Sequence, residues 1–316
     1  MTAGIRLVLL LALAAPLAAR AAEPLAAGDH ELTLEHGGLE RSYLAHLPPQ
    51  AGRPLPVVIN LHGGGGNATA HQKYTRMDAL ADREGFIVLY PNGTGRFGRI
   101  LLTWNAGTCC GSAALEGVDD VGFIAAMLDD LAARTPVDAK RVYATGLSNG
   151  AMMAYRLAAE LPQRIAAIAP VAGSMVLPGP IAHPVPVLDI HSVDDPRALY
   201  AGGLGPPFPM TTTRVFHPPV AETLARWAAA NHCTEGEPRV AETRQGSGES
   251  AGHTATLLVW QGCAAPLEHW KLTGAGHVWP GGKLKYLTHL LGPGTDVIDA
   301  NAEMWKFFSR FRLGAR

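Results

Sequence analysis

The residue best placed for chemistry is Ser148, at the centre of Gly146-Leu147-Ser148-Asn149-Gly150, a match to G-x-S-x-G. The preceding residues, Arg141–Thr145, predict a short buried strand, and Ala151–Ala159 predict a helix. A strand that turns sharply into a helix strains the turn residue, and small neighbours prevent a clash there. This geometry lifts the Ser148 hydroxyl out of the sheet at the positive end of the helix, where it can act as a nucleophile.

A second G-x-S-x-G match surrounds Ser250, at Gly248-Glu249-Ser250-Ala251-Gly252. With 36 glycines in the chain, such a match can arise by chance. This copy lies in a polar stretch rich in glycine and serine, with no apolar strand before it and no amphipathic helix after it. Its context predicts a solvated loop rather than a nucleophile.

Two further residues complete a possible catalytic set. Asp195 and His277 each follow a predicted strand, and Ser148, Asp195 and His277 occur in that order. An imidazole can take the proton of a serine hydroxyl, and a carboxylate holds that imidazole in the required tautomer. The order serine, acid, histidine is that of α/β-hydrolases. Asp194 directly precedes Asp195 and is an alternative for the acid.

Backbone amides for an oxyanion hole can also be assigned. The unbroken apolar run Leu55–Leu61 predicts a central strand covered on both faces, and it ends in His62-Gly63-Gly64-Gly65-Gly66-Asn67. Glycines at the end of such a strand let backbone N–H groups approach a ligand closely. We expect the amides of Gly64 and Asn149 to bind a developing oxyanion.

The remaining pattern predicts one α/β domain over residues 22–316, with a mostly parallel central sheet and helices on both faces, as in the α/β-hydrolase fold. An antiparallel hairpin at residues 30–47 is expected at one edge. Asp119 and Asp120 are interpreted as residues at a helix N-terminus. The segment 198–219 is rich in glycine and proline and is expected to be irregular. Further strands are expected at 86–90, 165–172, 185–191, 255–260 and 267–272, and further helices at 70–84, 120–133, 220–231 and 299–311.

Two tryptophans are candidates for substrate binding. Trp104 lies in the long connection 91–117, and a loop of this length is usually functional. Trp279 stands two residues after His277. A flat indole beside the reacting ester would favour a planar acyl group or a short apolar chain. Packing in the core is the alternative for either residue.

The N-terminus has the features of a secretory signal peptide over residues 1–21. Arg6 precedes an apolar run, and Ala19-Arg20-Ala21 supplies a cleavage site of small residues. We therefore expect a secreted or periplasmic protein.

The formal net charge is −1 and no basic run occurs, so nucleic acid is not expected as a partner. No other apolar run would span a membrane, no metal-ligand spacing is present, and the chemistry requires no cofactor.

The four cysteines suit an oxidising compartment. A bridge between Cys233 and Cys263 would close a loop of about 30 residues and contribute roughly 3–4 kcal/mol in the chain-entropy model. Cys109 and Cys110 are adjacent, and they could form a vicinal disulfide or remain thiols.

Taken together, LHGGGGNA, WNAGTCCG, VDDVGFI, GLSNGAMMAYRLA and GHVWPGG resemble the polyhydroxybutyrate depolymerase and feruloyl esterase family of secreted α/β-hydrolases. The resemblance covers the chain from about Leu47 onwards. It implies that Ser148 is the nucleophile, His277 the base and Asp195 the acid, and the Cys233–Cys263 bridge fits the family pattern. The family often has His-Gly-Thr-x-Asp at the acid, where this chain has His191-Ser192-Val193-Asp194-Asp195. The segment 199–217 is longer than usual, so the rim of the pocket is expected to differ.

The sequence therefore predicts a secreted serine esterase that hydrolyses feruloyl-type or short hydroxyalkanoate esters, either polymeric or derived from plant cell walls. Long-chain lipids are not expected as substrates, since no lid or extended apolar groove is apparent. A serine peptidase of the same fold is an alternative, although such enzymes usually carry an additional gating domain. A non-catalytic polymer-binding protein is another, and the complete set Ser148, Asp195 and His277 argues against it.

Overall fold

The fold is organised by one ten-stranded sheet in the order β1-β2-β4-β3-β5-β6-β7-β12-β11-β10. The computed structural model describes residues 25–208, 212–234 and 236–314, so the predicted signal peptide at 1–21 lies outside the described residues. Neighbouring strands from β4 to β12 are parallel, and antiparallel pairs extend both edges. The strands are β1 (Gly28–His36), β2 (Leu39–Leu47), β3 (Leu55–Leu61), β4 (Ile87–Pro91), β5 (Val137–Leu147), β6 (Ala167–Val171), β7 (Val187–Ser192), β10 (Arg239–Gln245), β11 (Thr254–Val259) and β12 (Leu267–Thr273), with the separate pair β8 (Gly203–Leu204) and β9 (Phe216–His217).

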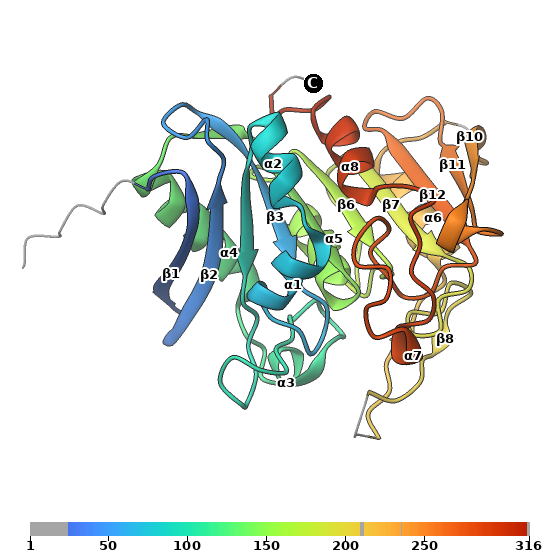
Figure 1. Ribbon diagram of the computed structural model, residues 1–316, viewed down its shortest axis with the longest axis horizontal. Helices are drawn as coiled ribbons and strands as arrows, with labels where there is room; N and C mark the ends of the chain where they lie inside the picture. The colour runs from blue at the N-terminus through green and yellow to red at the C-terminus, as the bar shows by residue number, and fades with distance from the viewer. Residues whose placement is uncertain (1–24, 209–211, 235, 315–316) are drawn as a thin grey trace, which may run out of the picture.

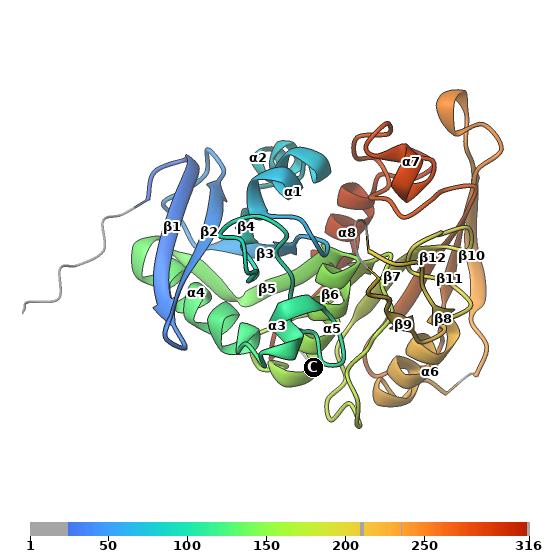
Figure 2. The same ribbon diagram turned by 90° about the horizontal axis from the view of Figure 1, so that it is seen from below.

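Helices cover both faces of the sheet, which confirms the predicted fold class. One face carries α4, α5 and α6, and the other carries α1, α2 and α8 (Figures 1 and 2). No helix among the described residues is long and apolar enough to cross a lipid bilayer. The helices are α1 (Ala68–Thr75), α2 (Asp78–Glu84), α3 (Gly111–Leu115), α4 (Asp120–Arg134), α5 (Asn149–Glu160), α6 (Val220–Ala230), α7 (Thr288–Leu291) and α8 (Ala300–Phe308), with a 3₁₀ turn at Gly248–Ser250.

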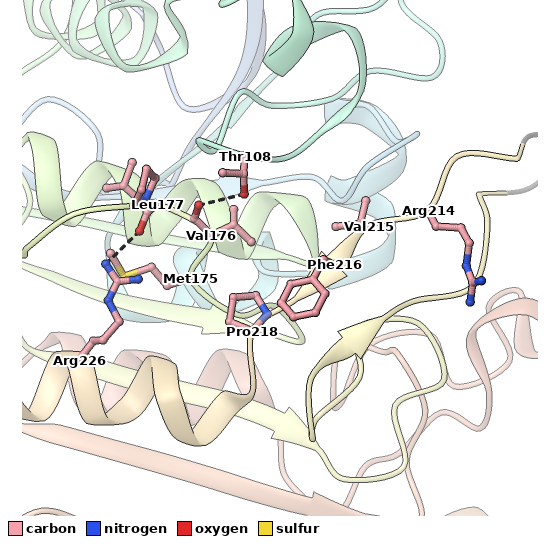
Figure 3. A pocket seen from close by; sticks show the side chains of 10 residues that line it. Thr108, Met175, Val176, Leu177, Arg214, Val215, Phe216, Pro218 and Arg226 are labelled. Carbon is pink, nitrogen blue, oxygen red and sulfur yellow. Dashed lines mark hydrogen bonds between the residues drawn. The ribbon is translucent and has the colours of Figure 1, made fainter.

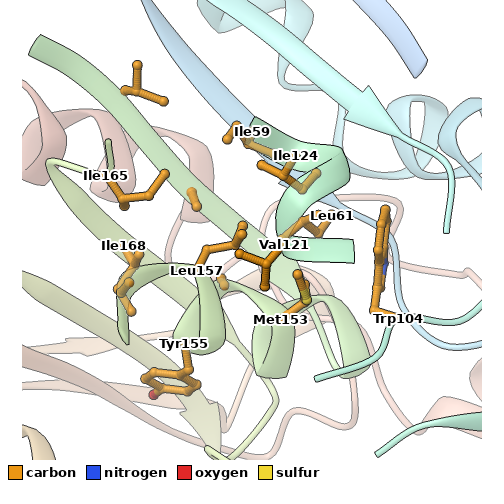
Figure 4. Close-up of a cluster of buried hydrophobic side chains, with 14 of the residues drawn as sticks. Ile59, Leu61, Trp104, Val121, Ile124, Met153, Tyr155, Leu157, Ile165 and Ile168 are labelled. Carbon is orange, nitrogen blue, oxygen red and sulfur yellow. The ribbon is translucent and has the colours of Figure 1, made fainter. Parts of the chain in front are cut away.

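The core lies on both sides of β3, because alternate residues of a strand point to opposite faces. Ile59 and Leu61 belong to the cluster that contains α4 and α5, whereas Val58 belongs to the cluster that contains α2 and α8. Figure 4 shows Ile124 of α4 and Met153 of α5 in the first cluster. The continuous apolar run of β3 is thus buried on both faces, as the sequence predicts.

Two local predictions are wrong. The helix expected at 70–84 is divided into α1 and α2, because Arg76 adopts a left-handed conformation with φ 56° and its amide caps α1. The edge strand β10 was not expected, because its sequence Arg239–Gln245 is polar and charged rather than apolar. An edge strand tolerates such a sequence because one of its sides and much of its surface meet water.

The connection 91–117 is fixed by a buried ion pair at the start of α4. Asp119 caps the helix as expected, accepting a hydrogen bond from the amide of Gly122. Asp120 has a different role: it accepts hydrogen bonds from Arg41 and from the amide of Asn105, both at 2.7 Å. Its side chain is 0% exposed and that of Arg41 is 2% exposed. The pair therefore ties the long connection to strand β2.

Both possible disulfides are formed, and no described cysteine is free. Cys233–Cys263 joins the end of α6 to the turn between β11 and β12. Cys109–Cys110 is a vicinal bridge in the connection 91–117. The first closes a segment with a sequence separation of 30, so it restricts the unfolded chain, while the second closes almost no loop.

We predict that the double variant Cys233→Ser/Cys263→Ser is less stable than the wild type by roughly 3–4 kcal/mol, because its unfolded chain gains conformational freedom. Denaturant unfolding followed by circular dichroism measures the difference. Peptide mapping without reduction should recover the two wild-type cysteine peptides linked. Free thiols at either position, or equal stability of the two proteins, would contradict this assignment.

Candidate active site

The turn between β5 and α5 has the strained backbone that the sequence predicts for Ser148. Its φ is 57° and its ψ is −119°, a conformation that L-residues rarely adopt. The Ser148 amide donates to the carbonyl oxygen of Val171 at 2.9 Å. A Cβ atom on Gly150 would collide with the carbonyl oxygens of Leu61 and His62. The turn therefore packs backbone against backbone at the end of β3, and only glycine fits there.

The structure brings Asp195 and His277 into contact, although 82 residues separate them. The Asp195 Oδ2 and His277 Nδ1 atoms lie 2.7 Å apart. The other carboxylate oxygen, Oδ1, accepts from the amides of Arg197 at 2.7 Å and Ala198 at 2.8 Å. Asp194 is exposed, and its carboxylate instead accepts from the amide of Gly274 at 2.7 Å. This geometry favours Asp195 over Asp194 as the acid.

A second imidazole, that of His191, also contacts Asp195. Its Nε2 atom lies 3.4 Å from Asp195 Oδ2 and 2.8 Å from the carbonyl oxygen of Ala198. Burial alone would raise the pKa of Asp195, but the charge of His277 and the hydrogen bonds of both imidazoles hold it below its usual range. Burial alone would lower the pKa of His191, but its hydrogen bond with Asp195 raises it. The carboxylate is therefore ionised at neutral pH. Sequence reasoning assigned no role to His191.

Gly64 and Asn149 lie side by side, as an oxyanion hole requires. A Cβ atom on Gly64 would lie 3.6 Å from the Cβ atom of Asn149. The Gly64 amide has no acceptor among the described residues, whereas the amides of Gly65 and Gly66 bond to Leu102 and Gly63. Asn149 is the first residue of α5, so its amide has no acceptor within the helix. Both amides can therefore bind a ligand oxygen.

Trp104 fixes Asn149 by a reciprocal pair of hydrogen bonds. The Trp104 amide donates to Asn149 Oδ1 at 2.7 Å, and Asn149 Nδ2 donates to the Trp104 carbonyl oxygen at 3.1 Å. The indole Nε1 donates to the carbonyl oxygen of His62 at 2.9 Å. His62 Nε2 accepts from the amide of Gly93 at 3.0 Å, and burial lowers its pKa to about 4, so the ring is neutral. The connection 91–117 thus fixes Asn149 and the strand end at His62 that precedes Gly64, the two places where the oxyanion hole is predicted.

A pocket of about 650 Å³ joins these groups, with Ser148, His277, Gly64 and Asn149 in its lining. Most of its wall is apolar, and much of it comes from the connection 91–117, the segment 199–217 and the residues in and next to the short helix α7. The first was expected to be functional and the second to shape the rim, whereas the third was not expected at the site. Apolar lining residues in these three segments are Phe97, Leu101, Phe208, Val215, Leu287, Leu290 and Leu291.

The prediction that Trp104 and Trp279 bind substrate is wrong, because neither lines this pocket. Trp104 is 0% exposed and Trp279 is 1% exposed. The indole Nε1 of Trp279 donates to Asn301 at 3.0 Å, and its ring packs edge-on against His71. Both indoles therefore pack behind the pocket wall, although each lies close in sequence to residues of the site.

Ser250 lies apart from the pocket, but not in the solvated loop that was expected. It is 0% exposed, its hydroxyl donates to the carboxylate of Asp296, and it accepts from the amide of Asp296 at 2.9 Å. No imidazole contacts it among the described residues. Ser250 therefore fixes a turn and has no base to activate it.

A smaller pocket of about 330 Å³ shares Val215 with the first (Figure 3). Two arginines line it, and backbone carbonyl groups engage both. Arg226 Nη2 donates to Leu177 and Gly179, and Arg214 donates to Leu204 and Gly205. No serine or cysteine lines this pocket among the described residues, so it offers no second nucleophile.

Within the described part of the chain, one group of side chains has the spacing of metal ligands, namely Asp29, His46 and Asp78. Its ligand atoms already have protein partners. His46 bonds to Asp29 at 2.6 Å and to Asp82 at 2.9 Å, while Asp78 accepts from Tyr90 at 2.7 Å. The group lies outside the pocket that contains Ser148, so it has no place in the chemistry of that site.

Comparisons with known proteins agree with this geometry. A model of the family described as esterase PHB depolymerase matches residues 41–203. A putative esterase, NocK, from Nocardia uniformis subsp. tsuyamanensis is 32% identical over 281 residues, covering 81% of this chain and 75% of that protein. Feruloyl esterase B from Piromyces equi is 31% identical over 202 residues, covering 59% of this chain but 34% of that protein. An acetyl xylan esterase structure from Aspergillus awamori has a TM-score of 0.59 at 18% identity, covering 89% of this chain and 99% of that one, which shows the shared fold.

We predict that a fluorophosphonate probe labels Ser148 and that Asp195→Asn slows the labelling by up to about 10⁴-fold, because the imidazole then takes the wrong tautomer. Asp194→Asn is the matched control and should label at close to the wild-type rate, since its carboxylate contacts only the amide of Gly274. Rates of labelling from intact-protein mass spectrometry decide between the two. If Asp194→Asn is the slow variant, the two assignments must be exchanged.

Proposed function

Because the chain belongs to the esterase PHB depolymerase family and is a carboxylic ester hydrolase, we propose that it is a secreted serine esterase with Ser148, His277 and Asp195 as its catalytic residues. One observation carries the proposal. The strained Ser148, the imidazole of His277 and the residues Gly64 and Asn149 border one pocket, although they come from three separate connections, and the buried Asp195 bonds to His277 from a fourth.

The reaction follows from these positions. The Ser148 oxygen attacks the ester carbonyl carbon while His277 takes the hydroxyl proton, and the carbonyl oxygen becomes an oxyanion held by the amides of Gly64 and Asn149. When the carbon–oxygen bond to the alcohol breaks, His277 returns the proton to the leaving alcohol. Water then attacks the acyl-enzyme with His277 as base, which releases the carboxylic acid and restores Ser148. The buried, ionised Asp195 stabilises the imidazolium in both halves of the reaction.

The pocket supports esters of aromatic acids or short hydroxyalkanoates as substrates. Apolar residues in the segments 97–101, 206–208, 213–217 and 286–291 line much of the pocket around Ser148. Burial of the substrate's apolar surface against Phe208 and Leu101 can provide the binding energy that stacking on Trp104 and Trp279 was expected to provide. The related feruloyl esterase and the family description both concern esters of this kind.

Export from the cytoplasm is supported by two features. Residues 1–21 have the charge, apolar run and cleavage site of a signal peptide. The two disulfides, Cys233–Cys263 and Cys109–Cys110, are typical of an oxidising compartment. We therefore place the mature enzyme outside the cell or in a periplasm.

We predict that Ser148→Ala lowers kcat/KM for 4-nitrophenyl acetate by at least about 10³-fold, whereas Ser250→Ala remains within about twofold of the wild type. The reason is that Ser148 alone of the two borders the pocket with His277. Steady-state assays at a temperature where all three proteins are folded provide the comparison. Turnover by Ser148→Ala at the wild-type level would refute the proposed mechanism.

A further inference from the structure

One charged side chain distinguishes the pocket around Ser148. Among the residues that the structure describes, Arg197 is the only Asp, Glu, Lys or Arg residue in its lining. The Arg197 side chain donates one hydrogen bond, from Nη2 to the carbonyl oxygen of Pro207 at 3.1 Å, and it forms no ion pair within the described chain. An arginine side chain keeps its charge at physiological pH. The lining therefore includes a cation with no carboxylate of the described chain in ion-pair contact, and the negative charge that acts on it is that of Asp195.

His217, at the end of β9, is a second unsatisfied polar group in the same lining. It is 7% exposed, and its Nδ1 atom is buried without a hydrogen-bond partner. Neither ring nitrogen bonds to any group in the part of the chain that the structure describes. Burial first, and then the nearby charge of His277, lower the pKa of His217 to about 4. The neutral ring thus carries one N–H group, and no group in the described chain accepts a hydrogen bond from it.

The two residues lie at one corner of the pocket, close to the catalytic acid. The backbone amide of Arg197 donates to Asp195 Oδ1, so the arginine is anchored by the same turn that positions the acid. Gly205 packs between them: a Cβ atom there would lie 2.9 Å from His217 Nε2 and 3.0 Å from the carbonyl oxygen of Arg197. The Gly205 amide bonds to Val215 at 2.9 Å, which holds the β9 segment against this turn.

Asp195 does not neutralise Arg197 in an ion pair. Its Oδ1 atom accepts from the amides of Arg197 and Ala198, and its Oδ2 atom bonds to His277 and lies beside His191. Arg197 is thus the one charged residue in the described lining of a pocket whose other walls are mostly apolar. A neutral apolar ligand that filled this pocket would displace water from the Arg197 guanidinium. Its N–H groups would then lack a hydrogen-bond acceptor, which opposes binding.

We propose that Arg197 and His217 form a carboxylate-binding subsite, so that the preferred substrates are esters that also carry a free acid group, as the ends of short hydroxyalkanoate oligomers do. The inference rests on the proposed esterase function and concerns the same pocket. A carboxylate accepts charge-assisted hydrogen bonds from a guanidinium and a further bond from an imidazole N–H group. The apolar walls then bind the hydrocarbon part of the same molecule.

The test compares two dimers of 3-hydroxybutyrate, one with a free carboxylate and one capped as a neutral N-methylamide. Chromatography follows cleavage of the internal ester, and the ratio of the two kcat/KM values is the readout. We expect the wild type to prefer the free acid by about tenfold or more, the size of effect that one charge-assisted hydrogen bond gives. Arg197→Met should bring the ratio close to one, and His217→Phe should lower it.

Two controls separate the subsite from general effects. Arg83→Met removes an exposed arginine that pairs with Glu84 on α2, and it should keep the wild-type ratio. Raising the salt concentration should lower the wild-type ratio, because screening weakens attraction between charges. Equal kcat/KM values for the two dimers in the wild type, or an unchanged ratio in Arg197→Met, would overturn the subsite while the esterase function stands. No hydrolysis of either dimer or of 4-nitrophenyl acetate would overturn both.

Discussion

The site depends on the close approach of two backbones, where the turn after β5 packs on the end of β3. Gly150 lies directly against the carbonyl oxygens of Leu61 and His62, and any larger residue would push the turn away. This contact holds Ser148 in its strained conformation and brings the amide of Asn149 next to Gly64. Strain of this kind persists only where the surrounding packing fixes it. The proposed nucleophile and the proposed oxyanion-hole residues are therefore one structural unit, built where the ends of two central strands meet.

That unit is fixed further by a series of polar contacts that begins on strand β2. Arg41 on β2 pairs with Asp120, and Asp120 accepts from the amide of Asn105. The adjacent Trp104 holds Asn149 by two hydrogen bonds and His62 by a third. Burying an ion pair costs free energy, and it is retained here where it orders a long connection. Trp104 and Asn105 therefore position Asn149 from behind the pocket wall, whereas Phe97 and Leu101 of the same connection line the pocket.

The parts of the fold with a periodic or continuous pattern could be predicted from the sequence. Leu55–Leu61 is β3 with the same bounds, and the strand–turn–helix context separates Ser148 from Ser250. The apolar residues of the pocket wall could not be predicted individually, since Phe97 and Phe208 lie in connections and Leu290 in the one-turn helix α7, where no periodic pattern fixes the direction of a side chain. Nearness in sequence also misleads: Trp279 is two residues from His277, yet its ring points into the core. The choice between Asp194 and Asp195 required the partner of each carboxylate, which is information that only the tertiary structure holds.

The two outer strands of the sheet have a consequence for the behaviour of the protein in solution. Each leaves one row of backbone N–H and C=O groups without a neighbouring strand, and such a row can recruit a strand from another copy. β10 carries Arg239, Glu242 and Arg244, and β1 carries Glu31 and Glu35 at alternate exposed positions. An incoming strand would have to strip water from these charges before any ladder could form. Both edge strands of the sheet therefore carry charged side chains, and these oppose edge-to-edge aggregation in a concentrated solution of the enzyme.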